Sequence, residues 1–324
     1  MAIVKWGIIG CGDVTEIKSG PAFNKVKNST LVAVMRRNAE KAKDYAKRHG
    51  VPKWYKDADK LINDPEVNAI YVATPPDSHL EYALKAIHAG KPVYIEKPVA
   101  LNASQAKQID KAVKKSKVKA VVAHYRRSQP LFKKIKQLIE EGTIGEVQFA
   151  TLQLYKKRLE DKTPENMWRI DPDQSGGGLF HDLAPHQLDL MLYFFGDIKH
   201  ARGIATNRGC AYEADDFVSG TILFASGVVF NGVWSFSVPP SEEKDYCEII
   251  GSEGKISFSV FEGNSIQINK NGEVAQLVFD SIAHVQQPMI EDVVDYFSGN
   301  RNDSPCSTQT GVEVMQIIDS FTLK

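Results

Sequence analysis

The strongest constraint on the fold is the alternation of short apolar runs and amphipathic segments along residues 1–123. Parallel strands that are buried on both faces require such continuous apolar runs. The segments between the runs carry helix ends: residues 39–49 close on Gly50, and Ser78-His79-Leu80-Glu81 has the spacing of a capping box for a helix that stops at Ala89-Gly90. Strands separated by helices imply right-handed crossovers and predict a doubly wound α/β sheet. The predicted strands are Ile3–Ile9, Leu31–Met35, Ala69–Ala73, Val93–Ile95 and Lys119–Ala123.

The chain changes character near His124, where strands begin to follow one another without intervening helices. Pairs of apolar runs flank short polar turns, which predicts hairpins in a largely antiparallel sheet. We expect one face of this sheet to pack on helices such as Leu188–Phe195, and the other to be solvated or to form a subunit interface. The predicted domains are therefore 1–123 and 124–324. The later strands are Glu146–Arg158, Phe217–Phe224, Val228–Phe236, Tyr246–Ile250, Ile256–Val260, Ile266–Asn269 and Val274–Phe279, and the last helices are Met289–Phe297 and Gly311–Phe321.

Charge and composition exclude several classes of protein. The 324 residues carry 40 basic and 40 acidic side chains, so the basic footprint of a nucleic-acid-binding protein is absent from the sequence. The longest apolar runs have the length of strands and are too short to span a membrane. The first apolar run leads into glycines and does not resemble a signal peptide. Four scattered cysteines without a CxxC pair predict a reducing, cytoplasmic location.

The first apolar run ends in Gly10-Cys11-Gly12, a position that can bind a dinucleotide. In that context Gly10 permits a tight turn, and Gly12 lets the backbone approach a pyrophosphate at the N-terminus of the helix that begins with Asp13 and Val14. Thr15 occupies the third glycine position, so the fingerprint is incomplete. A plain structural turn is the alternative, and the strand–turn–helix context favours the cofactor site.

The end of the second predicted strand reads Arg36-Arg37-Asn38. An NAD-selective site usually has an acidic residue here, which binds the ribose hydroxyls. Guanidinium groups bind a 2′-phosphate through charge-assisted hydrogen bonds. The sequence therefore predicts NADP(H) over NAD(H), with a solvated basic turn as the alternative.

Two further strand ends carry polar residues, because ligands of such sheets bind at the carboxyl ends of the strands. Thr74-Pro75-Pro76 follows the third predicted strand and is expected to cover the dinucleotide. Glu96-Lys97-Pro98 follows the fourth, where Lys97 can stabilise negative charge on a substrate oxygen. A surface lysine is the alternative.

The segment Gly176–Asp189, GGGLFHDLAPHQLD, permits three interpretations: a hinge, a metal site, or an acid–base pair. Metal binding is disfavoured, because the spacing is not HExxH, cysteines are absent nearby, and two imidazoles five residues apart do not share a helical face. If a helix begins near Asp182, with Pro185 in its first turn, Asp182 and His186 lie on one face. Asp189 is expected to cap or orient a structural group, and His181 is either a substrate contact or a packed histidine.

Together these motifs, with His79 after the Thr-Pro-Pro turn, resemble the Gfo/Idh/MocA oxidoreductase family over essentially the whole chain. The resemblance implies an N-terminal NAD(P)-binding Rossmann domain, and a C-terminal domain that binds substrate and forms homodimers or homotetramers through its open sheet. It also implies hydride transfer to or from a sugar, polyol, inositol or trans-dihydrodiol, without a metal. The implied catalytic residues are Lys97, Asp182 and His186, and the implied cofactor contacts are Gly10, Gly12, Asp13, Val14, Arg36, Arg37, Thr74, Pro75, Pro76, His79, Glu96 and Lys97.

In the implied mechanism His186 exchanges a proton with the substrate hydroxyl, because an imidazole can both accept and donate near neutral pH. Lys97 holds the reacting oxygen, and Asp182 orients the imidazole or touches an adjacent hydroxyl. Arg126, Trp168, Arg169 and His181 are weaker substrate candidates, for which interface or packing roles stay open. The alternatives are an NAD-retaining glycoside hydrolase, a non-catalytic sugar or nucleotide sensor, and a biliverdin-reductase-like enzyme.

Overall fold

The computed structural model describes residues 3–159 and 167–322. Contacts between residues divide the chain into two compact units. The first unit comprises Met1–Ser128 and Ile282–Met315, and the second comprises Gln129–Ser281 and Gln316–Lys324. The return of residues 282–315 to the first unit was not part of the prediction. It follows from contacts between positions far apart in sequence, such as the bond from the Val122 N–H to the Cys306 carbonyl at 3.0 Å.

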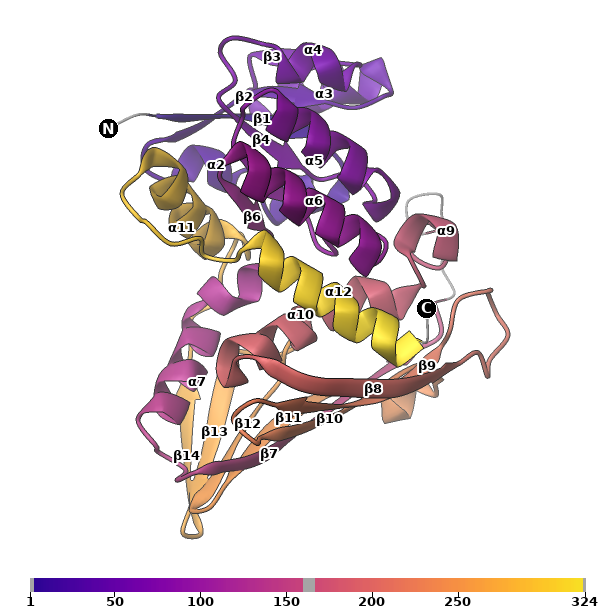
Figure 1. The fold of residues 1–324 in the computed structure, drawn as a ribbon, viewed down its shortest axis with the longest axis vertical. Helices are drawn as coiled ribbons and strands as arrows, with labels where there is room; N and C mark the ends of the chain where they lie inside the picture. The colour runs from indigo at the N-terminus through magenta and orange to yellow at the C-terminus, as the bar shows by residue number, and fades with distance from the viewer. Residues whose placement is uncertain (1–2, 160–166, 323–324) are drawn as a thin grey trace. The chain divides into compact units, whose positions relative to one another are not determined.

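The first unit contains a parallel sheet with the strand order β3-β2-β1-β4-β5-β6, which confirms the predicted doubly wound architecture (Figure 1). Its strands are β1 (Val4–Ile9), β2 (Ser29–Met35), β3 (Lys53–Tyr55), β4 (Ala69–Val72), β5 (Val93–Ile95) and β6 (Ala120–Val122). The central strands are buried except at Lys5, and Ile8, Ile70 and Val93 have no exposed surface. Strand β3 was not predicted, because its three residues include a lysine and two half-polar aromatics at the sheet edge.

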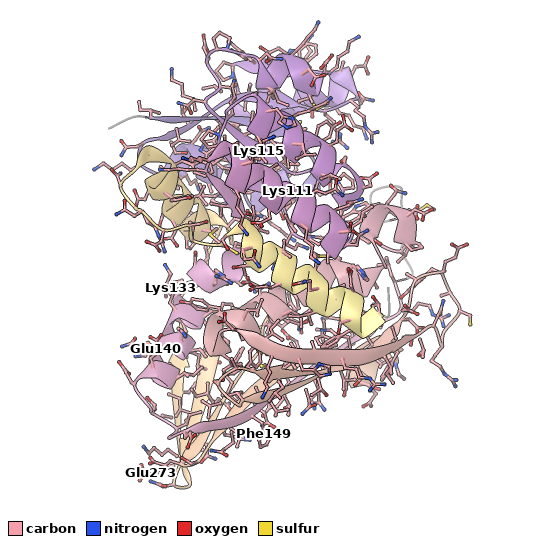
Figure 2. All side chains as sticks on the ribbon, viewed as in Figure 1. Lys111, Lys115, Lys133, Glu140, Phe149 and Glu273 are labelled. Atoms are coloured by element: carbon pink, nitrogen blue, oxygen red, sulfur yellow. The ribbon has the colours of Figure 1, made fainter. Side chains whose placement is uncertain are left out.

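The helices of the first unit follow the predicted crossovers. They are α1 (Asp13–Ile17), α2 (Ala22–Lys25), α3 (Ala39–His49), α4 (Ala58–Ile62), α5 (His79–His88), α6 (Ala103–Ser116), α11 (Gln287–Ser298) and the start of α12 (Thr308–Thr322), with 3₁₀ turns η1 (Pro76–Ser78) and η2 (Tyr125–Ser128). Helix α3 has its predicted bounds, because the Asn38 side chain accepts from the Lys41 N–H at its start and Gly50 ends it in the left-handed conformation. On α6, Lys111 and Lys115 are exposed one turn apart, while Ile109 is buried (Figure 2).

The capping box expected at Ser78 is wrong. The Ser78 side chain makes no capping hydrogen bond, and its hydroxyl instead donates to Thr74 Oγ1 at 2.8 Å. Helix α5 is entered from η1, so the N–H of His79 already has the Pro76 carbonyl as its partner. The preceding turn thus already supplies a backbone partner for the first N–H of α5.

The second unit contains a sheet with the order β14-β13-β12-β11-β7-β10-β9-β8, in which every neighbouring pair is antiparallel except β7 and β10. Its strands are β7 (Val147–Lys157), β8 (Ile198–Thr206), β9 (Phe217–Phe224), β10 (Val229–Val238), β11 (Lys244–Gly251), β12 (Gly254–Phe258), β13 (Ser265–Lys270) and β14 (Glu273–Val278). This confirms the mostly antiparallel sheet. Strand β8 was not predicted, because charged residues such as Lys199 and Arg202 interrupt its apolar pattern.

Helices α7 (Pro130–Glu140), α9 (Pro172–Ser175) and α10 (Leu179–Phe195), with the 3₁₀ turn η3 (Pro240–Glu242), complete the second unit. Aromatic side chains pack α10 against one face of the sheet: the Phe180 and Trp234 ring centroids are 5.1 Å apart, and those of Phe195 and Phe224 are 5.3 Å apart. On the other face, strand positions alternate with the buried ones and stay partly exposed, including Phe149 on β7 (Figure 2). Across residues 3–159 and 167–322, no helix combines the length and apolar character of a membrane span.

Candidate active site

The carboxyl ends of the first unit's parallel strands bring together the residues predicted to bind a cofactor. Gly10 follows β1, Arg36 follows β2, Thr74 lies just beyond β4, and Glu96-Lys97 follows β5. Successive strands are added on opposite sides of β1, because β2 and β3 lie on one side of it and β4 to β6 lie on the other, so the strand order switches between β1 and β4. Such a switch point is where doubly wound sheets bind nucleotides.

The turn after β1 requires glycine at one position and leaves open space at the other. Gly10 has φ +92°, and a Cβ there would lie 2.7 Å from the Thr74 backbone nitrogen. A Cβ on Gly12 would meet only the Gly10 carbonyl oxygen, at 3.9 Å. Asp13 and Val14 then open α1. The bare backbone of Gly12 therefore fits the close approach of a pyrophosphate to this turn.

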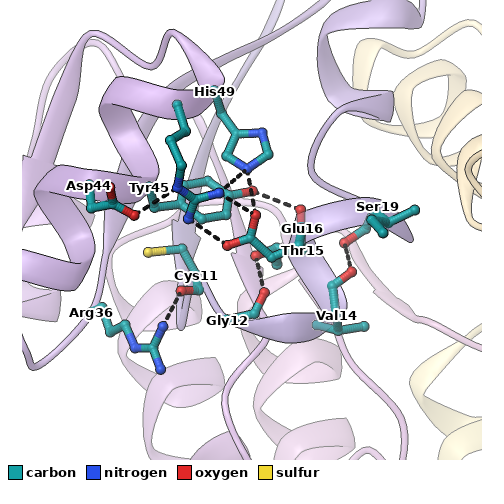
Figure 3. Close-up of polar contacts among 12 residues, drawn as sticks. Cys11, Gly12, Val14, Thr15, Glu16, Ser19, Arg36, Asp44, Tyr45 and His49 are labelled. Carbon is teal, nitrogen blue, oxygen red and sulfur yellow. Dashed lines mark hydrogen bonds and ion pairs between the residues drawn. The ribbon is translucent and has the colours of Figure 1, made fainter.

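The threonine at the third glycine position is accommodated by its own hydrogen bonds (Figure 3). Thr15 is fully buried, its hydroxyl donates to the Gly12 carbonyl at 2.7 Å, and its carbonyl accepts from the Tyr45 hydroxyl at 2.8 Å. The Thr15 carbonyl oxygen approaches Gly20 closely, and a Cβ on Gly20 would lie only 2.1 Å from that oxygen. The backbone of the buried Thr15 thus packs closely against Gly20, a glycine beyond α1 that sequence spacing did not identify.

An ion cluster fastens this turn to the next helix. The Arg48 guanidinium on α3 binds the Glu16 carboxylate of α1 with two bonds, at 2.7 and 2.8 Å, and His49 Nε2 lies 2.8 Å from the same carboxylate (Figure 3). The hydrogen bonds from Arg48 lower the pKa of Glu16 to about 2. Beside it, burial raises the pKa of the Cys11 thiol to about 11, so this thiol is protonated and unreactive at neutral pH.

The two arginines after β2 differ in their surroundings. Arg36 is half-buried and its Nη1 donates to the Cys11 carbonyl at 3.4 Å, which keeps the guanidinium beside the glycine turn (Figure 3). Arg37 is exposed. Asn38 is occupied as the cap of α3. The three residues that follow β2 therefore place two positive charges where the adenosine ribose of a dinucleotide is expected.

His79 ties together two of the loops at this edge. Its Nδ1 lies 2.8 Å from the Pro98 carbonyl and its Nε2 2.7 Å from the Thr74 carbonyl, and the ring is 1% exposed. Two carbonyl acceptors favour a ring that donates from both nitrogens, whereas burial, the larger effect, lowers the pKa of His79. The imidazole thereby joins the loop of Thr74, Pro75 and buried Pro76 to the loop that carries Lys97.

Glu96 is buried beneath the Lys97 turn at 4% exposure. Its carboxylate accepts the Lys97 backbone N–H at 3.1 Å and the Gln286 side-chain amide at 2.5 Å, together with the Tyr71 hydroxyl. Gln286 was not predicted from the sequence, because it lies 190 positions from Glu96 and no local pattern marks it. The Glu96 side chain thus lies under the turn and holds the backbone from which Lys97 projects.

In the second unit, the glycine run forms the turn between α9 and α10. Gly178 has φ +85°, and a Cβ there would lie 2.4 Å from Ala214 Cβ; one on Gly177 would lie 2.2 Å from the His181 ring. Ser175 Oγ accepts the N–H groups of Gly177 and Gly178 at 3.3 and 2.7 Å. Local packing alone therefore accounts for these glycines.

Helix α10 begins at Leu179, three residues before the expected start, so Pro185 lies within the helix and not in its first turn. Asp182 and His186 are one turn apart on the same face. Asp182 Oδ2 lies 3.3 Å from Arg169 Nε, and the Arg169 guanidinium lies 4.7 Å from the centroid of the Trp168 ring. The second unit thus brings three predicted site residues together: Trp168, Arg169 and Asp182.

His186 is 3% exposed, and its ring lies edge-on to Phe261 at 5.8 Å. The turn that presents Phe261 is fastened by Asp245, whose carboxylate accepts the N–H groups of Val260, Phe261 and Glu262 at 3.1, 2.5 and 2.8 Å. Asp245 was also missed by the sequence analysis. The His186 imidazole therefore packs against a ring whose turn Asp245 holds in place.

The remaining candidates lie in separate places. His181 is 1% exposed and packs against Gly177 and the edge of the Phe180 ring, which favours the packed-histidine interpretation. Asp189 is likewise 1% exposed. Arg126 belongs to the first unit, in η2, with its guanidinium 5.7 Å from the Tyr125 ring centroid. Within the part of the chain that the structure describes, no three His, Cys, Asp or Glu side chains gather as a metal-binding group.

The sequence matches one protein family in both units. Residues 4–124 match the oxidoreductase family with an NAD-binding Rossmann fold, and residues 132–257 match the GFO/IDH/MocA C-terminal domain. Oxidoreductase P35 of Formosa agariphila is 49% identical over 98% of both chains. Trans-1,2-dihydrobenzene-1,2-diol dehydrogenase of Xenopus laevis is 28% identical over 88% of this chain and 83% of its own.

The fold is also found among solved structures. Levoglucosan dehydrogenase in complex with NADH and levoglucosan superposes with a TM-score of 0.87 over 98% of this chain and 96% of its own, at 23% identity. A structural similarity at 23% sequence identity is evidence for a shared fold alone. The two family matches and the 49% identical relative show more: the chain belongs to the Gfo/Idh/MocA family and is an NAD(P)-dependent oxidoreductase.

Proposed function

We propose that the protein transfers hydride between NADP(H) and a ring carbon bearing a hydroxyl or carbonyl group in a cyclic sugar, polyol, inositol or trans-dihydrodiol. Membership of the family supports an oxidoreductase that acts on sugar-like or polyol-like substrates, without naming one of them. The observation that carries the proposal is the placement of Asp182 one turn before the buried His186, on the same face of α10. A carboxylate and an imidazole on one face suit proton exchange with a substrate hydroxyl.

We assign His186 to the proton, Lys97 to the substrate oxygen and Asp182 to orientation. When bound, the nicotinamide supplies or takes up the hydride. In oxidation His186 accepts the hydroxyl proton, and in reduction its imidazolium returns a proton to the same oxygen. The Lys97 ammonium stabilises the negative charge that develops on that oxygen. Arg169 holds Asp182 at 3.3 Å and fixes the direction of its carboxylate.

The proposed preference for NADP(H) rests on Arg36 and Arg37. The half-buried Arg36 is restrained beside the glycine turn by the Cys11 carbonyl, so little side-chain entropy is lost when its guanidinium binds a phosphate. We expect NADP(H) to exceed NAD(H) in kcat/KM, and Arg36→Ala to reduce that ratio at least tenfold with little change for NAD(H). An equal or higher kcat/KM with NAD(H) in the unaltered protein would refute the preference.

The proposed substrate class draws on two relatives. One is named for a ring diol and the other was crystallised with levoglucosan, and both names describe rings with hydroxyl groups.

We also propose a homodimer or homotetramer through the open face of the second unit's sheet, where half-buried Gln153, Val233 and Tyr246 alternate with buried residues. Light scattering after size exclusion tests this, and a monomer at micromolar concentration contradicts it. A cytoplasmic location is part of the same proposal.

The deciding experiment compares Lys97→Met and His186→Asn with Lys111→Met, an exposed lysine on α6. The substrates tested are inositols, aldoses, anhydrosugars and ring diols, and turnover is followed by the change in nicotinamide absorbance. We expect the first two variants to lose at least about 10²-fold in kcat, the usual contribution of a general acid–base group for His186 and of an oxyanion-stabilising group for Lys97, while cofactor affinity stays within a few-fold. Normal turnover in either variant refutes the assignment. Turnover without net change in the cofactor would instead indicate the glycoside-cleaving reaction.

A further inference from the structure

We propose that Gln286, on the segment that returns to the first unit, is a positioning residue for Lys97 and acts through the buried carboxylate of Glu96. The inference rests on the proposed catalytic role of Lys97. All residues involved belong to the first unit.

The Glu96 carboxylate is held at both oxygens. Oε2 accepts the Lys97 backbone N–H at 3.1 Å, and Oε1 accepts the Gln286 side-chain amide at 2.5 Å and the Tyr71 hydroxyl. A carboxylate at 4% exposure depends on such donors, because water cannot replace them. Gln286 therefore supplies one of the donors that hold this carboxylate under the turn.

Gln286 is itself fixed at every polar atom of its side chain. The residue has no exposed surface, its Oε1 accepts the Tyr94 hydroxyl at 3.0 Å, and its backbone N–H donates to the Lys18 carbonyl at 3.1 Å. Carboxylate oxygens accept hydrogen bonds from an amide NH₂, so the orientation of the amide follows from chemistry. The glutamine thus links Tyr94 on β5 with Glu96, two residues further along.

This geometry places the Lys97 backbone between two fastenings. Glu96 holds the N–H of Lys97 from below, and His79 holds the carbonyl of the next residue, Pro98, at 2.8 Å. Replacing Gln286 with an apolar residue removes a donor from Glu96 and the acceptor of Tyr94 together. The carboxylate then keeps the Tyr71 hydroxyl and the Lys97 N–H but loses one of its three donors, so the restraint on the turn that carries Lys97 is weakened. Small displacements of a catalytic group reduce turnover strongly while affecting binding less.

Two substitutions distinguish a residue that positions Lys97 through Glu96 from one that only fills space in the core. Gln286→Leu keeps the volume and removes both hydrogen bonds. Gln286→Glu places a second carboxyl beside Glu96, and two carboxyls this close share one proton. The second variant should therefore regain activity as the pH falls. The other titratable groups near Glu96 are Tyr71, Tyr94, His79 and Lys97. They are present in every variant, so their titration cancels when the kcat of a variant is divided by the kcat of the unaltered protein at the same pH. Burial holds the pKa values of both tyrosines well above their ordinary range.

The matched controls are Gln287→Leu and Gln287→Glu, at the adjacent half-exposed glutamine that bonds Glu291 at 3.1 Å. We expect Gln286→Leu to lower kcat at least tenfold, with KM and the NADPH dissociation constant within twofold. The kcat of Gln286→Glu relative to the unaltered protein should rise at least fivefold between pH 8 and pH 5.5. Both Gln287 controls should stay within twofold throughout.

Unchanged kcat in a folded Gln286→Leu overturns the inference, and so does equal loss of kcat and cofactor affinity. If Gln286→Leu does not fold, the pH response of Gln286→Glu decides alone, and a flat ratio overturns the inference. Lys97→Met separates the two proposals. An active Lys97→Met refutes the proposed function, whereas an inactive Lys97→Met beside a fully active Gln286→Leu refutes only the role of Gln286.

Discussion

The ion cluster between α1 and α3 should make the cofactor turn sensitive to acid, and Glu16→Gln tests this. The pKa of Glu16 falls from 4.5 to about 2 because Arg48 binds it with two hydrogen bonds. If all of this difference favoured folding, it would correspond to about 3 kcal/mol. Arg48 is 47% exposed, so solvent screening reduces the expected contribution to about 1 kcal/mol.

The direction with pH follows from the lowered pKa. The contribution is complete above about pH 4.5 and is lost as the pH falls through about 2, with about two-fifths gone at pH 3.5. We therefore expect Glu16→Gln to lower the free energy of unfolding by about 1 kcal/mol at pH 7 and by visibly less at pH 3.5. Urea unfolding followed by circular dichroism is the assay, because guanidinium would screen the charges.

The matched control is Glu40→Gln, an exposed carboxyl in the first turn of α3, for which we expect about 0.5 kcal/mol or less. Equal effects of the two substitutions would mean that the Arg48 pair adds nothing beyond a helix-end charge. A Glu16→Gln effect of the same size at pH 7 and pH 3.5 would refute the electrostatic explanation.

The remaining predictions concern packing at the two glycines of the cofactor turn and at the core of α10. Gly10→Ala should lower the free energy of unfolding by about 1–3 kcal/mol, because its Cβ would meet the Thr74 backbone in a left-handed conformation. Gly12→Ala should leave stability within about 0.5 kcal/mol while weakening NADPH binding at least tenfold by fluorescence titration, and unchanged binding would contradict the pyrophosphate site. Gln187→Leu should lower the free energy of unfolding by about 1–3 kcal/mol, because the buried Trp234 indole N–H donates to the Gln187 side chain at 2.6 Å. The double variant with Trp234→Phe should lose less stability than the sum of the two single variants, and strict additivity would contradict the pairing.

Local signals in the sequence were sufficient for most of the fold. Strand β5 and helix α3 have their predicted bounds, because an apolar run and a helix with an Asn start and a Gly end are decided by neighbouring residues. The Ser78 capping box was wrong because a 3₁₀ turn leads directly into the helix and bonds the His79 N–H, and the Ser78 side chain makes no capping bond. The start of α10 was missed because the Gly178 turn, packed on Ala214, permits helix three residues earlier.

The candidate site divides in the same way. Motif spacing identified Lys97, Asp182 and His186, whose roles remain proposals. Gln286 and Asp245, which fix Glu96 and Phe261, carry no local signal, because their partners are 190 and 16 residues away. Sequence patterns thus identify the groups expected to act, and the supporting contacts emerge only once the chain is folded.

The return of residues 282–315 to the first unit has a consequence for how the protein is made. During synthesis the first six strands leave the ribosome long before Gln286, Cys306 and Thr308, which bond Glu96, Val122 and Asp110. Until then Glu96 lacks one of its donors and β6 lacks a neighbour. The sheet is therefore expected to complete its core only after residues 129–281 of the second unit have emerged, and such long-range closure slows folding. An N-terminal fragment that stops at the apparent boundary near residue 124 would be an aggregation-prone intermediate rather than an independent cofactor-binding domain.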